Sequence, residues 1–157
     1  MTDTLYQTAV GALERLGRAP IADGPGALTL VLEGTHGPYA ARLRVDDERR
    51  ALFLHVASPV RVDKPLRRYP VAELILRTGF GLPVGGIDLA FDTGELRYRV
   101  GVDLGEDGVL GDARLGRLLD GAVAVLDWVH PALAAVAVEA EDPYFAAKEL
   151  GVEQPHD

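Results

Sequence analysis

The chain has 157 residues, of which 48% are hydrophobic and 25% are charged, a composition typical of one globular domain. Its formal net charge of −8 argues against general binding to nucleic acid or to anionic membranes, because both require a basic surface. The sequence has no cysteine, which excludes disulfides, thiolate catalysis and metal centres held by thiolates.

The N-terminal segment carries acidic residues where a secretory signal peptide needs basic ones. No apolar run approaches the ~18 residues of a membrane span. We therefore expect a single cytoplasmic domain over residues 1–157, in which residues 151–157 form a frayed tail.

The first half of the chain predicts one helix and three strands. Residues 3–17 repeat apolar side chains at helical spacing, and residues 18–26 form a turn region rich in proline and glycine. Alternating side chains predict strands at residues 28–33 and 39–45, and a nearly unbroken apolar run predicts a third strand at residues 52–56. The third strand, LFLHV, is almost wholly apolar, so we expect it to be central and covered on both faces, or covered by a partner.

The second half predicts helices on either side of a hairpin. A helix contains residues 71–78, and either it begins at Pro70 or Pro70 kinks it. From Asp112 an apolar stripe predicts a long core helix, which Pro131 is expected to interrupt so that residues 131–138 form a separate segment. Asp142 and Pro143 begin a last short helix that ends near Leu150.

Residues 81–104, GLPVGGIDLAFDTGELRYRVGVDL, predict a β-hairpin by alternation on both arms. A two-residue loop at Thr93-Gly94 would pair Ile87 with Val100 and Asp88 with Arg99. A longer turn remains open, because that loop would place the acidic residues 92 and 95 side by side. The fold class is then α+β: a five-stranded antiparallel sheet with helices packed on one face, in the order α-β-β-β-α-β-β-α plus a short C-terminal helix.

Two stretches resemble a known family: AELILRTGFGLPVGGIDLAFDTGELRYRVGVDL, from Ala72 to Leu104, and DWVHPALAAV, from Asp127 to Val136, followed by DPYFAAKEL. They are similar to the YbjN-type family of bacterial proteins, named for a role in sensory transduction, whose fold is similar to that of type III secretion chaperones. The resemblance implies a small cytoplasmic protein that forms homodimers and acts through protein contacts. It brings no catalytic residues.

The loop of residues 103–112 is similar to a calcium-binding loop only in part. Asp103 and Asp107 fit the pattern, but Arg114 stands where a bidentate glutamate is required. We interpret the loop as an acidic turn before the long helix. An alternative function, a small-ligand-binding protein or an enzyme, would need a pocket here with clustered carboxylates from Asp103, Glu106 and Asp107.

The remaining motifs indicate no catalysis and no cofactor. Residues 79–86 are rich in glycine, but a helix precedes them and a strand follows, the reverse of a dinucleotide site. No histidine has a metal-binding spacing, and the only serine, Ser58, precedes a proline rather than lying in a nucleophile elbow. We therefore predict no catalytic residue, no metal ligand and no cofactor, and a protein that is not an enzyme.

Two groups of residues are candidates for protein contacts. Arg61, Lys64, Arg67 and Arg68 form a basic run that could hold an anion or an acidic partner segment, although a solvated surface is the simpler interpretation, because exposed charges need no partner. Phe53 and His55, in the third strand, are candidates for a dimer or partner surface. The sequence thus predicts a regulator-like or chaperone-like module that binds an unidentified protein and is homodimeric.

Overall fold

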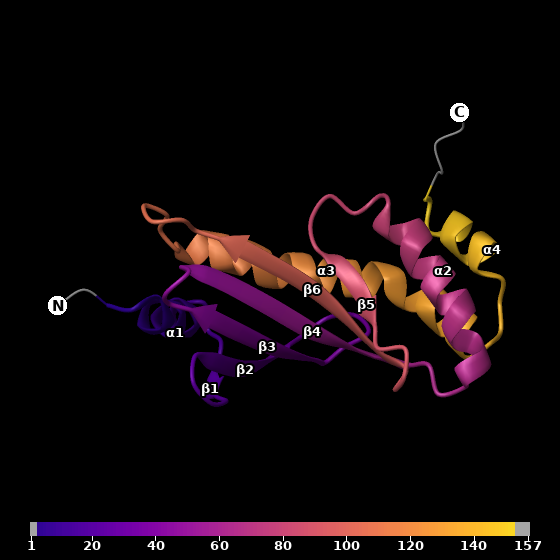
Figure 1. Cartoon of the computed structure of the whole chain (residues 1–157), viewed down its shortest axis with the longest axis horizontal. Coiled ribbons are helices and arrows are strands. Elements are labelled where there is room, and N and C mark those ends of the chain that lie inside the picture. Colours follow the sequence, from indigo (N-terminus) through magenta and orange to yellow (C-terminus); the bar gives the residue numbers. More distant parts are fainter. Residues whose placement is uncertain (1–2, 153–157) are drawn as a thin grey trace.

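The computed structural model describes residues 3–152, and its sheet has helices along one side (Figure 1). His156 and most of the predicted frayed tail lie outside the described residues. In chain order the elements are α1 (Leu5–Arg15), β1 (Ile21–Ala22), β2 (Ala27–Leu32), β3 (Tyr39–Asp46), β4 (Ala51–Arg61), the 3-10 turn η1 (Pro65–Arg67), α2 (Arg68–Gly79), β5 (Gly86–Leu89), β6 (Glu95–Asp103), α3 (Asp112–Ala137) and α4 (Pro143–Glu149).

The α+β class is confirmed, but the sheet has six strands rather than five. All neighbouring strands are antiparallel, in the order β1-β2-β3-β4-β6-β5. The additional strand is β1, where Ile21 pairs with Thr29 and Ala22 with Leu28. A strand of two residues is too short to alternate, which is why the sequence shows only a turn region there.

The predicted hairpin is two adjoining antiparallel arms, but its register is shifted by two residues. Ile87 pairs with Tyr98 and Asp88 with Arg97, and the turn runs from residue 90 to residue 95. The longer turn suits Gly94, which has a φ of 79° and approaches the carbonyl of residue 62 too closely for a side chain. Because a shift of two residues keeps every side chain on its face, the predicted core face of the hairpin survives.

Neither Pro70 nor Pro131 interrupts its helix. Pro70 is the third residue of α2, where its missing N–H would have had no partner within the helix. The prediction that Pro131 divides the long helix is wrong, since α3 continues through it to Ala137. Val129 and Leu133, on either side of the proline, are fully buried, and this packing holds the two halves in one helix.

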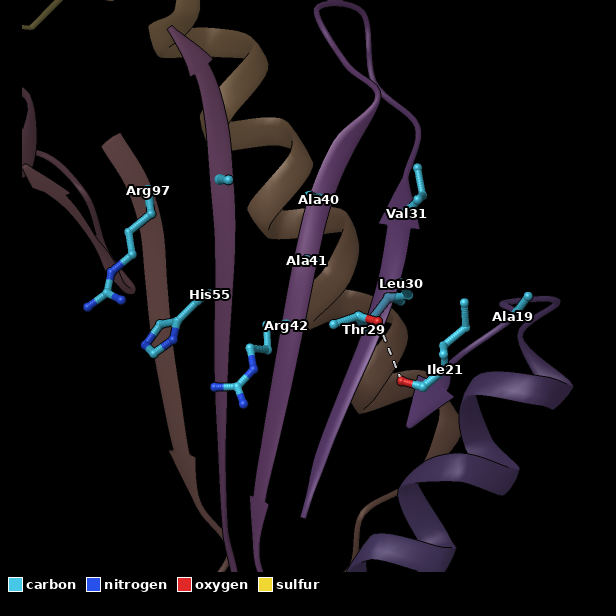
Figure 2. A pocket seen from close by; sticks show the side chains of 11 residues that line it. Ala19, Ile21, Thr29, Leu30, Val31, Ala40, Ala41, Arg42, His55 and Arg97 are labelled. Carbon is cyan, nitrogen blue, oxygen red and sulfur yellow. Dashed lines mark hydrogen bonds between the residues drawn. The ribbon is translucent and has the colours of Figure 1, made fainter. Parts of the chain in front are cut away.

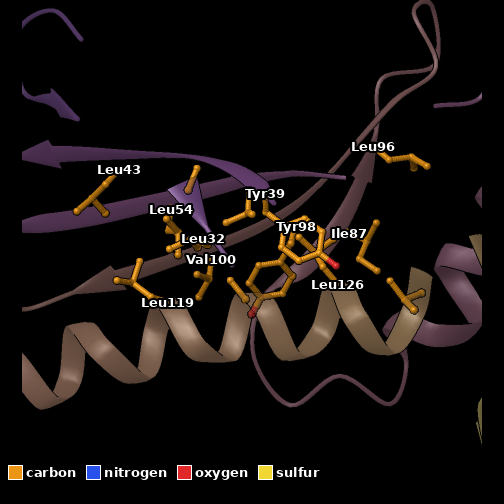
Figure 3. Packing of buried hydrophobic residues seen from close by; sticks show 14 of the residues in the cluster. Leu32, Tyr39, Leu43, Leu54, Ile87, Leu96, Tyr98, Val100, Leu119 and Leu126 are labelled. Atoms are coloured by element: carbon orange, nitrogen blue, oxygen red, sulfur yellow. The ribbon is translucent and has the colours of Figure 1, made fainter. Parts of the chain in front are cut away.

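The core lies between the sheet and α3. Alternate residues of β3, β4 and β6, among them Leu43, Leu54 and Val100, face the leucine stripe of α3, which includes Leu119 and Leu126 (Figure 3). Each such buried side chain contributes about 1.5–3 kcal/mol of hydrophobic free energy.

Helix α3 is long and apolar enough, by length and composition, to cross a membrane. Its buried leucines pack on the sheet, and core helices commonly meet those criteria. No membrane span follows from the helix.

Strand β4 is central as predicted, but no other part of residues 3–152 covers its second face. Leu52, Leu54 and Val56 point into the core, whereas Phe53 and His55 are half-buried on the opposite side. The strand is apolar on both sides, yet its helices lie on one side only (Figure 1). This uncovered surface is the place to look for function.

Candidate functional site

The open face is the side of the sheet turned away from the helices. The alternation that sends one residue of a strand into the core sends the next residue to this face. The ladder places Arg42 of β3 beside His55 of β4, and His55 beside Arg99 of β6, so these three cationic or titratable side chains form a row across the sheet. The other outward residues around the row are Thr29, Val31, Ala40, Arg44, Phe53, Ala57, Asp88 and Arg97.

On the β5–β6 side, two arginines share one carboxylate. The Nε atoms of Arg97 and Arg99 donate to Asp88 Oδ2 at 3.1 Å and 3.0 Å. Partial burial would raise the pKa of Asp88, but the hydrogen bonds from Arg99 and Arg97 outweigh it and lower that pKa below its ordinary value. Asp88 is therefore ionised at neutral pH. On the opposite side of the row, Arg42 Nε donates to Asp23 Oδ2 at 2.8 Å.

Arg44 has a different neighbour. Its guanidinium carbon lies 4.5 Å from the centroid of the Phe53 ring, on the adjacent strand, which is a cation–π arrangement. Desolvation lowers the pKa of His55, and the positive charge of Arg97, Arg99 and Arg44 lowers it further. His55 is therefore neutral at neutral pH and lies in a positive local field.

Beside the cationic row the open face is hollowed. A hollow of about 420 Å³ lies over β1 to β4, where small side chains of Ala40 and Ala57 leave room between larger neighbours. Ile21 and Val31, 68% and 60% exposed, form its apolar rim. Arg42, His55 and Arg97 point out of the sheet along its other side (Figure 2). The arrangement suits an apolar group accompanied by negative charge.

The predicted basic run lies elsewhere, around η1 and the start of α2. Arg67 donates from Nε and Nη2 to the carbonyls of Val136 and Glu141, both at 2.9 Å, and so satisfies main-chain oxygens around the end of α3. Arg68 donates to two further carbonyls, those of residues 62 and 92. Arg61 pairs with Asp63 and Glu95, and Lys64 is exposed. Binding of an anion or partner by this run stays a prediction.

The structure brings together residues that sequence reasoning treated separately. Phe53 and His55 lie in the middle of the open face, and their role as a partner surface stays a prediction. The arginines around them were visible only as the polar residues of alternating strands. Their convergence depends on the register of three strands, which one strand's pattern cannot give.

The acidic loop after β6 is organised around a basic side chain. Arg50 donates to the carbonyls of Gly105 and Gly108 at 3.0 Å and 2.7 Å, and Asp103 accepts from the amide of Gly105. A cation site would need carboxylates where this guanidinium lies. Within residues 3–152, no group of three acidic or histidine side chains could hold a metal ion.

A second polar cluster ties the β2–β3 turn to α3. Asp127 accepts from the amides of Thr35 and His36, at 2.9 Å and 3.0 Å, and from the hydroxyl of Tyr39 at 2.5 Å. Burial would raise the pKa of Asp127, but these hydrogen bonds lower it on balance. Gly34 is required here, because a Cβ would lie 2.6 Å from the Tyr39 ring. With three donors bound, the carboxylate fastens the turn and is not available as a general base.

His130 lies within the continuous α3, directly before Pro131. Its ring stacks on His36, with centroids 4.2 Å apart and planes within 9°. Its Nδ1 is buried and has no hydrogen-bond partner among residues 3–152. Desolvation lowers the pKa of His130, and the nearby His36 lowers it further.

Comparison with known proteins gives a fold but no close relative. Neither a family model nor a curated protein matches the sequence. Among solved structures, YbjN from E. coli, which its description proposes to be a transcription regulator, is 18% identical with a TM-score of 0.53, covering 86% of this chain and 89% of that one. The YbjN-type fold that the resemblance in the sequence implies is confirmed.

A second solved structure with this fold is the HopA1-SchA chaperone-effector complex. The matched chain is 17% identical with a TM-score of 0.54, and the match covers 78% of this chain and 91% of that chain. At these identities the likeness concerns the fold alone. What each of those proteins binds or regulates is a property of that protein.

Proposed function

We propose that this protein is a non-enzymatic protein-binding module, regulator-like or chaperone-like, that holds a polypeptide partner on its open face. One observation carries the proposal: the central strand β4 has an uncovered face on which Phe53 is half-buried and on which His55 and Ala57 line an apolar hollow. Antiparallel sheets often have one solvated face, but that face is then typically polar. The HopA1-SchA chaperone-effector complex, one chain of which has a related fold, supports a protein as the partner.

Exposure of the apolar groups on this face to water is unfavourable in free energy unless a partner covers them. Contiguous apolar patches on a soluble protein commonly mark sites of interaction. Here Ile21 and Val31 form the rim of the hollow, and Phe53 lies on the same face two residues before His55, which lines it. The nearby arginines supply the charged surroundings that protein interfaces favour.

Homodimerisation is the second part of the proposal, and we place it on α2 rather than on Phe53 and His55. Tyr69, Leu76 and Phe80 are spaced so that they share one stripe of the helix, and they are 73%, 76% and 70% exposed. A self-complementary contact between two such stripes would bury them.

The dimer is tested by size-exclusion chromatography with light scattering. We expect Leu76→Glu to convert a dimer to a monomer, because a carboxylate would be buried in an apolar contact. Val109→Glu is the matched control, since Val109 is 77% exposed but lies in the loop before α3. A dimer that survives Leu76→Glu unchanged would contradict this placement.

The partner surface is tested by photo-crosslinking in the native host. A benzophenone side chain replaces Phe53 on the open face or, as control, the exposed Ala113 of α3. We expect a discrete protein adduct from position 53 and none from position 113. Adducts of equal yield at both positions, or none at either, would count against the open face.

The remaining parts of the proposal follow from the sequence. From length, composition and charge we propose one domain over residues 1–157, a cytoplasmic protein and a partner that is neither a nucleic acid nor a membrane. A bacterial origin is proposed from the family resemblance alone.

A further inference from the structure

The centre of the open face is cationic although the chain as a whole is acidic. The net charge of the chain is −8. Within residues 3–152, the arginines at the centre of this face number four, and the carboxylates that pair with them number two. Among the described residues, the ion pairs give Arg44 no carboxylate partner and give Arg97 and Arg99 one between them. Two further carboxylates, Asp46 and Asp103, face the same way at the far ends of β3 and β6. The arginines are Arg42, Arg44, Arg97 and Arg99, and the carboxylates belong to Asp23 and Asp88.

Of the three existing ion pairs, the one between Arg42 and Asp23 is open to exchange on both sides, and the two to Asp88 are open on the arginine side. The side chains of Arg42 and Asp23 are 51% and 49% exposed, and that of Arg97 is 49% exposed. Exposed pairs of this kind contribute little to stability and are open to competition from another carboxylate. Asp88, shared by Arg97 and Arg99, cannot neutralise both.

The apolar hollow lies directly beside these cations. Arg42 and Arg97 contribute to its lining together with His55, while Ala40, Ala57 and Val31 supply apolar surface. In Figure 2 the arginine and histidine side chains rise from β3, β4 and β6, and the apolar rim lies over β1 and β2. An occupant therefore meets apolar and positive surface at adjacent points.

We propose, on the basis of the function proposed above, that the bound partner segment is acidic and carries one large apolar side chain. The apolar side chain occupies the hollow over Ala40 and Ala57. Carboxylates of the same segment pair with Arg42 and Arg97, displacing Asp23 and competing with Asp88. The neutral His55 between them adds a hydrogen-bonding group without adding charge.

Two other occupants fit less well. Small-molecule sites bury most of their ligand, whereas this hollow lies on the surface of a sheet. A nucleic acid is a long polyanion, and outside the centre of this face it would meet a chain of net charge −8. A short acidic segment needs only the few positive charges that this face offers.

The test is fluorescence anisotropy at low salt with a labelled short peptide in which Asp and Glu flank one central Phe. Three companion probes isolate the two features: the same peptide with Phe replaced by Ser, the same peptide with all acidic residues replaced by Lys, and a single-stranded DNA oligonucleotide of equal charge. We expect the acidic peptide with Phe to bind most tightly and the acidic peptide with Ser to bind more weakly. The Lys peptide and the DNA should not bind. Binding should weaken as salt is raised.

Variants then place the peptide on the open face. Arg42→Glu with Arg97→Glu should weaken binding by about tenfold or more, because two attractive pairs become repulsive. The matched control is Arg114→Glu with Arg117→Glu, an equal charge change on exposed residues of α3, which should leave binding within about twofold. Ala40→Phe fills the hollow without touching a charge, and should weaken the Phe peptide but not the Ser peptide.

Several results would overturn the inference. They are equal binding of the acidic and Lys peptides, tighter binding of the DNA, equal losses in the two double variants, or no binding by any peptide. A dimer that Arg42→Glu with Arg97→Glu dissociates would show that a second copy of the chain covers this face. If one of the listed binding results is obtained but position 53 still gives a protein adduct, the proposed function stands and only the inference that the partner segment is acidic is wrong. If the double variant dissociates a dimer, the proposed partner surface is wrong as well.

Discussion

The covered and open faces of this sheet are made by neighbouring residues of the same strands, yet they are built to different requirements. In β4 the inward Leu54 is 2% exposed and packs toward α3, whereas the next residue outward, His55, faces solvent among arginines. The inward residues must be apolar because they bury surface. The outward ones are free of that requirement, so an aromatic residue and four arginines gathered there are informative about binding.

The comparison predicts that stability depends on the covered face. We expect Leu54→Ala to lower the free energy of unfolding by about 2–5 kcal/mol, through lost burial and a cavity. The matched change on the open face, Phe53→Ala, should cost about 1 kcal/mol or less, since Phe53 is only half-buried. Urea denaturation of both variants measures the difference, and equal losses would mean that the open face is a structural surface too.

The next largest effect is expected where the covered side is fastened to the β2–β3 turn. Asp127→Asn should lower the free energy of unfolding by about 1–3 kcal/mol, because the amide replaces a charged acceptor of three hydrogen bonds. Tyr39→Phe, which removes only one of the three donors, should cost less. If the two changes cost the same, the main-chain hydrogen bonds to Asp127 contribute nothing.

Acidification should test that carboxylate directly. The pKa of Asp127 is lowered in the folded protein, so its contribution to stability is present above the unfolded value of about 3.9 and is lost as pH falls through the folded pKa. The free energy of unfolding of the wild type, measured by denaturation, should therefore decrease below about pH 4. The Asp127→Asn variant should show a shallower decline, and an identical decline would rule out this assignment.

A smaller pH effect compares a histidine on each side of the sheet. The pKa values of His130, on the covered side, and of His55, on the open face, are both lowered on folding. The unfolded chain then binds more protons than the folded one, so stability decreases as pH falls below about 6.5. His130→Phe keeps a ring to stack on His36 and should flatten this slope, and His55→Phe should do so separately. An unchanged slope in both variants would contradict the two shifts.

The sequence predicted the elements in which apolar residues recur at a regular spacing. Alternation identified β2, β3 and the hairpin arms, a continuous apolar run identified β4, and helical spacing identified α1, α2 and α3. It missed β1, whose two residues cannot alternate, and the continuity of α3 through Pro131, because packing outweighs the lost hydrogen bond there. The two-residue error in the hairpin arose because alternation determines the face of a side chain but not its partner.

The candidate site was less predictable than the fold. Phe53 and His55 were found because apolar residues on both sides of a strand are unusual. Arg42 and Arg97 come together only through the pairing of β3, β4 and β6, which is a tertiary property. Conversely, Arg67 stood out in the sequence as part of a basic run, while the structure uses its guanidinium on main-chain carbonyls.

The most direct test of the central claim uses the protein captured by the photo-crosslinker at position 53. Its dissociation constant is measured by isothermal titration calorimetry with the wild type, with Ala40→Phe on the open face and with Ala113→Phe on α3. We predict a Kd raised about tenfold or more by Ala40→Phe, since a filled hollow cannot accept a partner side chain, and a Kd unchanged by Ala113→Phe. Equal affinities of all three proteins would contradict the claim that the open face is the binding surface.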